Sequence, residues 1–147
     1  MTRLLVVRHG QSEWNAIGRW QGRADPPLTD EGRRQVADAA KVLGTFDAVV
    51  ASPLVRAVET AAVLADRLGI GPVLIDPDLM ERDAGERQGL TRTEIESGWP
   101  NFLESGPRPP CYETVQALRA RARAPPDPVH GVSGNSADLW GILTIKI

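Results

Sequence analysis

Four side chains that could act together on a phosphate ester lie just after three apolar runs of the sequence. Arg8 and His9 follow the first run, Arg56 follows the second, and Glu81 follows the third. Guanidinium groups are planar and always charged, so two arginines can hold a phosphoryl dianion and its spreading transition-state charge. A neutral imidazole is a competent nucleophile toward phosphorus, and a protonated carboxyl group can donate to the leaving oxygen. These residue types therefore predict phosphoryl transfer.

The three apolar runs predict strands at residues 4–7, 48–51 and 73–75. The first run is continuous, which is typical of a strand buried on both faces of a sheet. Helical periodicity follows the first two strands, over residues 30–43 and 52–68. Because ligands of open α/β sheets bind beyond the carboxyl ends of the strands, all four side chains are expected at one edge. The alternation predicts an α/β fold with a largely parallel sheet.

The two predicted helices have recognisable starts. Thr29 is expected to cap the first helix, and Ser52 the second, with Pro53 at its first helical position. Arg56 then lies in the first turn, and its side chain leans toward the helix N-terminus and the same sheet edge. Gly10 is expected to let the backbone approach the ligand closely, because glycine has no Cβ.

The region after Glu81 is less regular. Residues 91–97 and 112–124 predict short helices, and the proline-rich residues 98–110 predict a loop. Three arginines lie in the last turns of the predicted helix at residues 112–124: Arg119, Arg121 and Arg123. They are interpreted as a solvated face that complements the helix dipole, not as a ligand site.

Length and composition set outer limits on the function. The 147 residues suit one domain with a real core, and the net charge of −2 gives no basic face for nucleic acid or an acidic membrane. The single cysteine, Cys111, fits a reducing compartment, and no run resembles a signal peptide or a membrane span. We therefore expect a soluble cytoplasmic protein.

Five stretches, in this order over residues 3–95, resemble the histidine phosphatase (phosphoglycerate mutase-like) superfamily: LLVVRHGQSEWN, GRWQG, LTDEGRRQV, SPLVRAVETA and LMERDAGERQGL. The resemblance implies a three-layer α/β fold, a mostly parallel sheet with helices on both faces. It implies that His9 is phosphorylated, that Arg8 and Arg56 bind the phosphoryl group, and that Glu81 is the proton donor. Further phosphate or substrate contacts are implied for four residues: Ser12, Asn15, Gln21 and Gly22. The implied partner is a small phosphorylated substrate or inorganic phosphate, with no metal or organic cofactor.

Some of these residues also have structural interpretations. Glu81 has charged neighbours in sequence, such as Arg82, and could belong to an exposed ion pair. Core packing is a better explanation of Trp14 and Trp20 than a place at the pocket mouth. The four additional polar contacts could be turn residues only.

The C-terminal part departs from the family. Members carry a buried strand that ends in a second histidine and a glycine, whereas the other histidine here, His130, follows a single apolar residue. We place an incomplete histidine phosphatase-like domain at residues 1–124 and an atypical tail at residues 125–147. A frameshift, a truncation or an artificial end would each produce such a tail. Residues 142–147 predict a strand that could replace the missing one, which pairing with the sheet would test.

Three functions remain open on the sequence. The first is hydrolysis of phosphomonoesters through a phosphohistidine. The second is phosphoglycerate mutase activity, which is disfavoured because only a short proline-rich stretch follows the Glu81 region, where mutases carry a longer basic insertion. The third is an inactive phosphate-binding module that lacks the second pocket histidine. A missing strand would leave an unpaired edge, so we expect a homo-oligomer or poor solubility, which gel filtration would test.

Overall fold

The computed structural model describes residues 4–102, 111–123 and 142–146. Within these residues four parallel strands form one sheet, in the order β1-β4-β2-β3. Their bounds are Leu4–Arg8 for β1, Ala48–Ala51 for β2, Val73–Ile75 for β3 and Ile142–Lys146 for β4. The predicted α/β class and the three early strands are confirmed.

Strand β4 lies in the centre of the sheet. Its residue Thr144 is in register with Val6 of β1 on one side and with Val50 of β2 on the other. The predicted late strand is thus confirmed for Ile142–Lys146, and the expected gap in the middle of the sheet is filled by the chain itself. Residue 147 and His130 lie outside the described residues. The division of the chain at residue 124 stays a prediction, although β4 belongs to the sheet.

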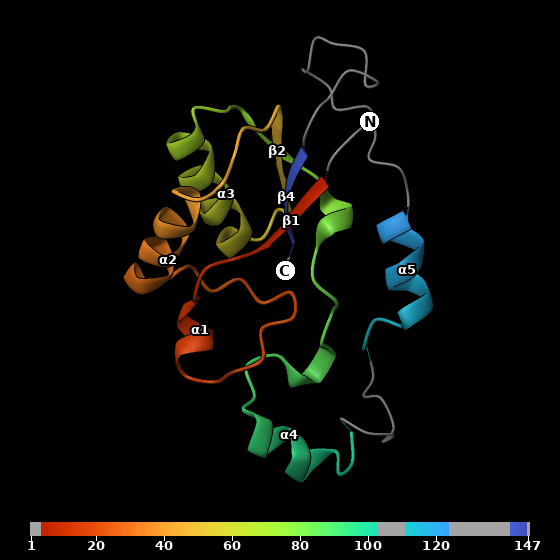
Figure 1. The fold of residues 1–147 in the computed structure, drawn as a ribbon. Helices are drawn as coiled ribbons and strands as arrows, with labels where there is room; N and C mark the ends of the chain where they lie inside the picture. Colours follow the sequence, from red (N-terminus) through yellow and green to blue (C-terminus); the bar gives the residue numbers. More distant parts are fainter. Residues whose placement is uncertain (1–3, 103–110, 124–141, 147) are drawn as a thin grey trace.

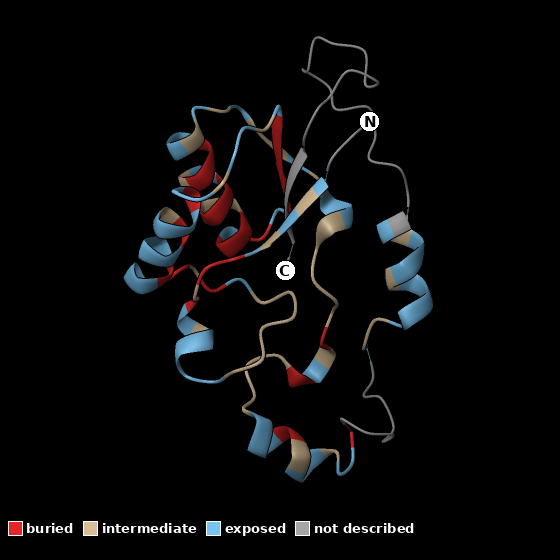
Figure 2. Cartoon of the chain, viewed as in Figure 1, coloured by how far each residue is buried: buried red, intermediate tan, exposed pale blue. Residues whose placement is uncertain are grey.

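Two helices, α2 (Asp30–Ala40) and α3 (Val55–Leu68), cover one face of the sheet (Figure 1). The apolar side chains between these helices and β2 form the core, which appears as the buried region of Figure 2. Its fully buried members are small or branched: Val49, Ala51, Ala57, Ala61 and Leu64. Small residues let α3 pack close to the sheet, and this places its N-terminus beside the end of β1.

The opposite face of β1 is not buried. Leu4 and Val6 are 60% and 54% exposed, and burial alternates along the strand. The prediction of burial on both faces is therefore wrong for β1, because α2 and α3 cover only one side. Figure 1 shows the 3-10 turn η1 (Pro77–Leu79) and helix α5 (Val115–Arg123) on the other side, where α5 contacts η1.

The start of α3 differs from the prediction. The helix begins at Val55, and Leu54 is its N-cap residue, so Ser52 and Pro53 precede the helix. The physical reason is a loop carboxylate: Asp25 accepts a hydrogen bond of 2.7 Å from the main-chain nitrogen of Val55 and replaces the expected cap. The helix ends as predicted, at a left-handed Gly69 with φ of 67°.

Other helix ends follow local chemistry. Thr29 caps α2 as predicted, by accepting from the nitrogen of Gly32 at 3.0 Å. The last predicted turn of α2 is tightened into i→i+3 bonds such as Leu43 to Ala40, so the regular helix ends at Ala40. The remaining helices are α1 (Glu13–Ala16), α4 (Arg92–Gly98) and the 3-10 turn η2 (Gly85–Arg87). None of the described helices has the length and apolar character needed to span a bilayer.

The central position of β4 makes a stability prediction. Proline at Thr144 removes a backbone N–H from the ladder, so Thr144→Pro should lower the free energy of unfolding by roughly 1–3 kcal/mol. Thr144→Val retains the N–H and the β-branched shape, and should stay close to the parent. Urea unfolding followed by circular dichroism measures both variants. Equal stability of the proline variant and the parent would show that β4 does not pair inside the sheet.

Candidate active site

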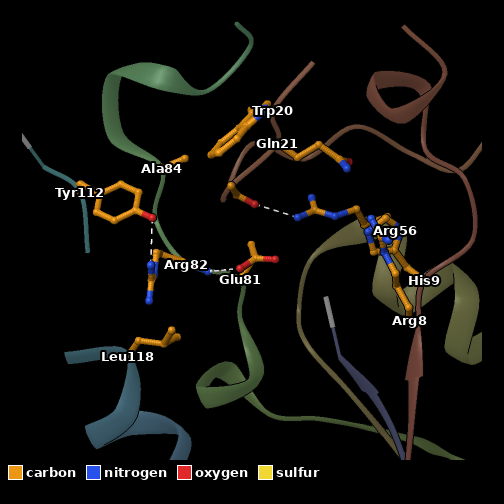
Figure 3. Close-up of a pocket in the computed structure, with 11 residues that line it drawn as sticks. Arg8, His9, Trp20, Gln21, Arg56, Glu81, Arg82, Ala84, Tyr112 and Leu118 are labelled. Carbon is orange, nitrogen blue, oxygen red and sulfur yellow. Dashed lines mark hydrogen bonds between the residues drawn. The ribbon is translucent and has the colours of Figure 1, made fainter. Parts of the chain in front are cut away.

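A cavity of about 340 Å³ opens at the carboxyl ends of the strands (Figure 3). This volume is at the small end of the range for ligand sites, which suits a small metabolite. All four residues of the predicted phosphoryl-transfer set line the cavity: Arg8, His9, Arg56 and Glu81. The structure therefore brings together side chains that follow three different strands.

His9 is 7% exposed and lies directly after β1. Its Nδ1 is 2.6 Å from the carbonyl oxygen of Gly10. Because a carbonyl oxygen only accepts, Nδ1 must carry the proton, and Nε2 retains the lone pair of a neutral imidazole. Burial lowers the pKa of His9 from its ordinary 6.5, the hydrogen bond to Gly10 offsets part of this, and the charges of Arg56 and Arg8 lower it further. His9 is thus held neutral and nucleophilic.

Arg56 is fully buried in the first turn of α3, as predicted. Its Nη1 donates to the carbonyl of Ala24 and its Nη2 to the carbonyl of Gly22, both at 2.7 Å. Its Nε is buried without a hydrogen-bond partner, and burial lowers the pKa of the guanidinium, which stays charged. Among the described ion pairs, none joins a carboxylate to Arg56 or Arg8. Glu81 and Asp25 lie close enough to raise the pKa of Arg56, but by less than burial lowers it, so the buried cation is only partly compensated and this site favours a bound anion.

The turn that carries His9 packs against both covering helices, α2 and α3. The nitrogen of Gly10 donates to Thr60 Oγ1 at 3.2 Å, and that hydroxyl donates to the carbonyl of Arg56 at 2.7 Å. A Cβ on Gly10 would lie 2.5 Å from the carbonyl oxygen of Gly32. The expectation that Gly10 lacks a Cβ for the sake of the ligand is therefore wrong: the close neighbour is helix α2.

The four additional polar residues fall into two pairs. Gln21 and Gly22 line the cavity. Ser12 and Asn15 do not appear among the lining residues; they form the capping box of α1, with Asn15 donating its main-chain N–H to Ser12 Oγ at 3.2 Å. Ser12 Oγ also donates to Gln21 Oε1 at 2.6 Å, which leaves the amide nitrogen of Gln21 free to donate to a ligand. A direct substrate contact by Ser12 or Asn15 stays a prediction.

Glu81 follows η1 and faces the cavity (Figure 3). Its Oε1 accepts from the main-chain nitrogen of Arg82 at 2.7 Å, so one carboxylate oxygen is oriented by its own loop. None of the described ion pairs includes Glu81. The structural alternative of an exposed ion pair does not describe this side chain.

Sequence reasoning missed part of the cavity wall: Trp20, Arg82, Ala84, Tyr112 and Leu118. Arg82 donates to the hydroxyl of Tyr112 at 2.9 Å and lies over its ring. Trp20 lines the cavity, and its ring also packs edge-on against the buried Phe102 with 6.2 Å between centroids, so the pocket and packing interpretations both apply to it. Its position next to Gln21 could have signalled this, as could that of Arg82 next to Glu81. No local pattern pointed to Tyr112 or Leu118, which come from a distant part of the chain.

The interpretation of Arg121 as part of a solvated face is also wrong. Its guanidinium donates to both oxygens of Glu113, at 2.7 and 2.9 Å, and to the main-chain carbonyls of Asp78 and Glu81. Arg121 is part of α5, so its guanidinium joins this helix to the loop that carries Glu81. As for metal ions, the described residues contain no group of three or more histidine, cysteine, aspartate or glutamate side chains arranged to hold one.

The chain belongs to the histidine phosphatase superfamily, because the model of the "Histidine phosphatase superfamily (branch 1)" matches residues 4–130. It is 39% identical over 133 residues to a probable phosphoglycerate mutase GpmB of Enterobacter sp. (strain 638), an alignment that covers 84% of this chain and 61% of that protein. It is 45% identical over 100 residues to a glucosyl-3-phosphoglycerate phosphatase of Mycolicibacterium vanbaalenii, with 67% of this chain and 44% of that protein covered. The chain thus spans less than two thirds of the length of these relatives.

Solved structures agree on the fold. A mycobacterial glucosyl-3-phosphoglycerate phosphatase in complex with VO3 superposes with a TM-score of 0.79 and 30% identity, over 98% of this chain and 74% of that one. Bacillus stearothermophilus YhfR superposes with a TM-score of 0.75 and 25% identity, over 100% of this chain and 74% of that one. The phosphoglycerate mutase-like α/β fold expected from the sequence is confirmed.

The environment of His9 predicts its titration. Its pKa in the folded protein should lie below 6.5. As the pH falls from 6.5, the unfolded chain then takes up a proton before the folded chain does, so the parent loses stability until the pH reaches the folded pKa. His9→Gln lacks this loss. An NMR titration measures the pKa, and the variant assigns the resonance; a His9 pKa at or above 6.5 would contradict the account of burial beside two arginines.

Proposed function

We propose that the protein hydrolyses the phosphomonoester of a small metabolite through a phosphohistidine at His9. The observation that carries this proposal is the cavity in which a neutral imidazole meets two arginines, neither of which forms an ion pair with a carboxylate among the described residues. Two such cations complement a phosphoryl dianion and the charge that spreads over its oxygens in the transition state. Membership of the histidine phosphatase superfamily supports the same reaction.

In the first step Nε2 of His9 attacks phosphorus with its lone pair, and the bond between phosphorus and the ester oxygen breaks. Arg8 and Arg56 bind the phosphoryl oxygens, and Gln21 adds a hydrogen bond from its amide nitrogen. Glu81 gives its proton to the departing alkoxide, which leaves as an alcohol.

In the second step water attacks the phosphorus of the phosphohistidine. Glu81, now a carboxylate, accepts a proton from this water, and the nitrogen–phosphorus bond breaks with its electron pair returning to Nε2. Inorganic phosphate leaves, and the neutral imidazole and the protonated carboxyl group are restored. The cycle needs no metal or organic cofactor.

Hydrolysis is preferred to mutase activity and to binding alone. One relative is a glucosyl-3-phosphoglycerate phosphatase, and the sequence between the Glu81 region and α5 has a short proline-rich stretch in place of the longer basic insertion expected of mutases. Another relative has the name of a probable phosphoglycerate mutase, so phosphoglycerate interconversion is the reaction to compare. An inactive module would bind phosphate without turnover.

The proposal extends to partners and place of action. We expect a small phosphorylated substrate, no nucleic acid and a cytoplasmic setting, on the grounds of the cavity size, the net charge of −2 and the single cysteine. A homo-oligomer stays a prediction. Its support is now the exposed apolar face of β1, where Leu4 and Val6 are 60% and 54% exposed.

A hydrolysis assay tests the proposed function. The parent should release phosphate from an aryl phosphate, and His9→Ala should lower kcat on the order of 10⁴-fold or more, because the covalent route is lost. Circular dichroism checks that the variant folds. Interconversion of phosphoglycerates at a rate above hydrolysis would favour a mutase, and folded parent protein that binds phosphate without releasing it from esters would favour the inactive module.

A further inference from the structure

The main chain of the proposed proton donor is held by two arginines. The carbonyl oxygen of Glu81 accepts from Arg23 Nε at 3.3 Å and from Arg121 Nη2 at 3.2 Å. A carbonyl oxygen has two lone pairs, so both of its acceptor positions are used. The two arginines come from opposite directions along the sequence, one from the loop before α2 and one from α5.

Glu113 joins these two arginines. Its carboxylate accepts from Arg121 at 2.7 and 2.9 Å, and its Oε1 lies 3.5 Å from Arg23 Nη2. The Glu113 side chain is 10% exposed and that of Arg121 is 16% exposed, so water screens this ion pair only partly. The hydrogen bond from Arg121 holds the pKa of Glu113 below its usual range, and the group is therefore ionised at neutral pH.

The same cluster also holds the residues on either side of Glu81. The nitrogen of Glu113 donates to the carbonyl of Asp83 at 3.1 Å, and the nitrogen of Asp83 donates to Glu113 Oε2 at 3.3 Å. Arg121 Nη1 donates to the carbonyl of Asp78 at 2.7 Å. The loop is thus fixed before, at and after Glu81.

We propose that Glu113, acting through Arg121 and Arg23, is a positioning residue that sets the distance between the Glu81 carboxyl group and the ester oxygen of the substrate. This inference rests on the proposed function, in which Glu81 is the proton donor. The Glu81 side chain is oriented by the nitrogen of the next residue, so it moves with the main chain that the cluster holds. A misplacement of about 1 Å can cost on the order of 10²-fold in rate.

The consequence depends on the leaving group. An alkoxide needs a proton as it departs, whereas a nitrophenolate departs without one because it is a weak base. Loss of the Glu81 position should therefore lower kcat/KM much more for an alkyl phosphate than for p-nitrophenyl phosphate. This parameter reports the steps up to phosphoryl transfer to His9, so it does not include the second step, in which Glu81 acts on water with either substrate. Damage to phosphate binding or to the fold would slow both substrates alike.

The test is Glu113→Gln, which retains the size of the side chain and removes its charge. We expect kcat/KM to fall on the order of 10–100-fold with glycerol 2-phosphate and no more than about threefold with p-nitrophenyl phosphate. An equal fall with both substrates, or no fall, would overturn the proposal. If this variant does not fold, Arg23→Lys serves instead. It retains the positive charge near Glu113 but loses the Nε–H that donates to the Glu81 carbonyl oxygen. It should also slow hydrolysis of the alkyl phosphate more than that of p-nitrophenyl phosphate.

Two further variants make the outcome specific. Glu59→Gln is the matched control, because Glu59 also accepts from a main-chain nitrogen, that of Leu28 at 3.0 Å, and pairs with Arg33 at 3.1 Å, but is not hydrogen-bonded to the Glu81 loop. It should affect both substrates equally. Glu81→Gln should show the largest difference between the two substrates, and adding Glu113→Gln to it should cause little further loss with the alkyl phosphate. If Glu81→Gln itself treats the two substrates alike, the proton-donor role fails; if it alone discriminates, only the role of Glu113 fails.

Discussion

The buried guanidinium of Arg56 is the constraint on which the arrangement of the site depends. A charged group that is fully withdrawn from water must be compensated, and here two main-chain carbonyls, of Gly22 and Ala24, supply only part of that compensation. The loop that provides them must therefore lie against the N-terminus of α3. An anion in the cavity would complete the compensation, and this links the stability of the loop to the presence of a phosphoryl group.

The other parts of the site can be understood from the same edge of the sheet. The end of β1 supplies the imidazole. The burial that leaves Arg56 partly uncompensated also keeps His9 neutral, and its hydrogen bond to Gly10 leaves the lone pair on Nε2. Glu81 belongs to a loop outside this core and is not itself part of a helix or strand. The ionic cluster of Arg23, Glu113 and Arg121 supplies the rigidity that this loop lacks. The charged arginine Arg56 is thus positioned by the core, whereas the proposed acid Glu81 is positioned by the ionic cluster outside it.

Local sequence patterns predicted those features that depend on neighbouring residues. Period and caps located the strands and helices, and strand order along the chain placed the phosphoryl-transfer residues at one edge. Features that depend on tertiary packing were not predictable in this way: the exposed face of Leu4, the capping of Val55 by Asp25, the close approach of Gly10 to α2, and the role of Arg121. Each of these depends on whether a residue far away in the sequence lies against the position, and a local pattern contains no signal for that.

The most direct test of the account is detection of the covalent intermediate. The parent is mixed with an aryl phosphate and quenched within the first turnover, and the peptide that contains His9 is examined by mass spectrometry. The account predicts one added phosphoryl group on His9, absent in His9→Ala. Phosphate release by the parent with an unmodified His9 peptide at every quench time would contradict it.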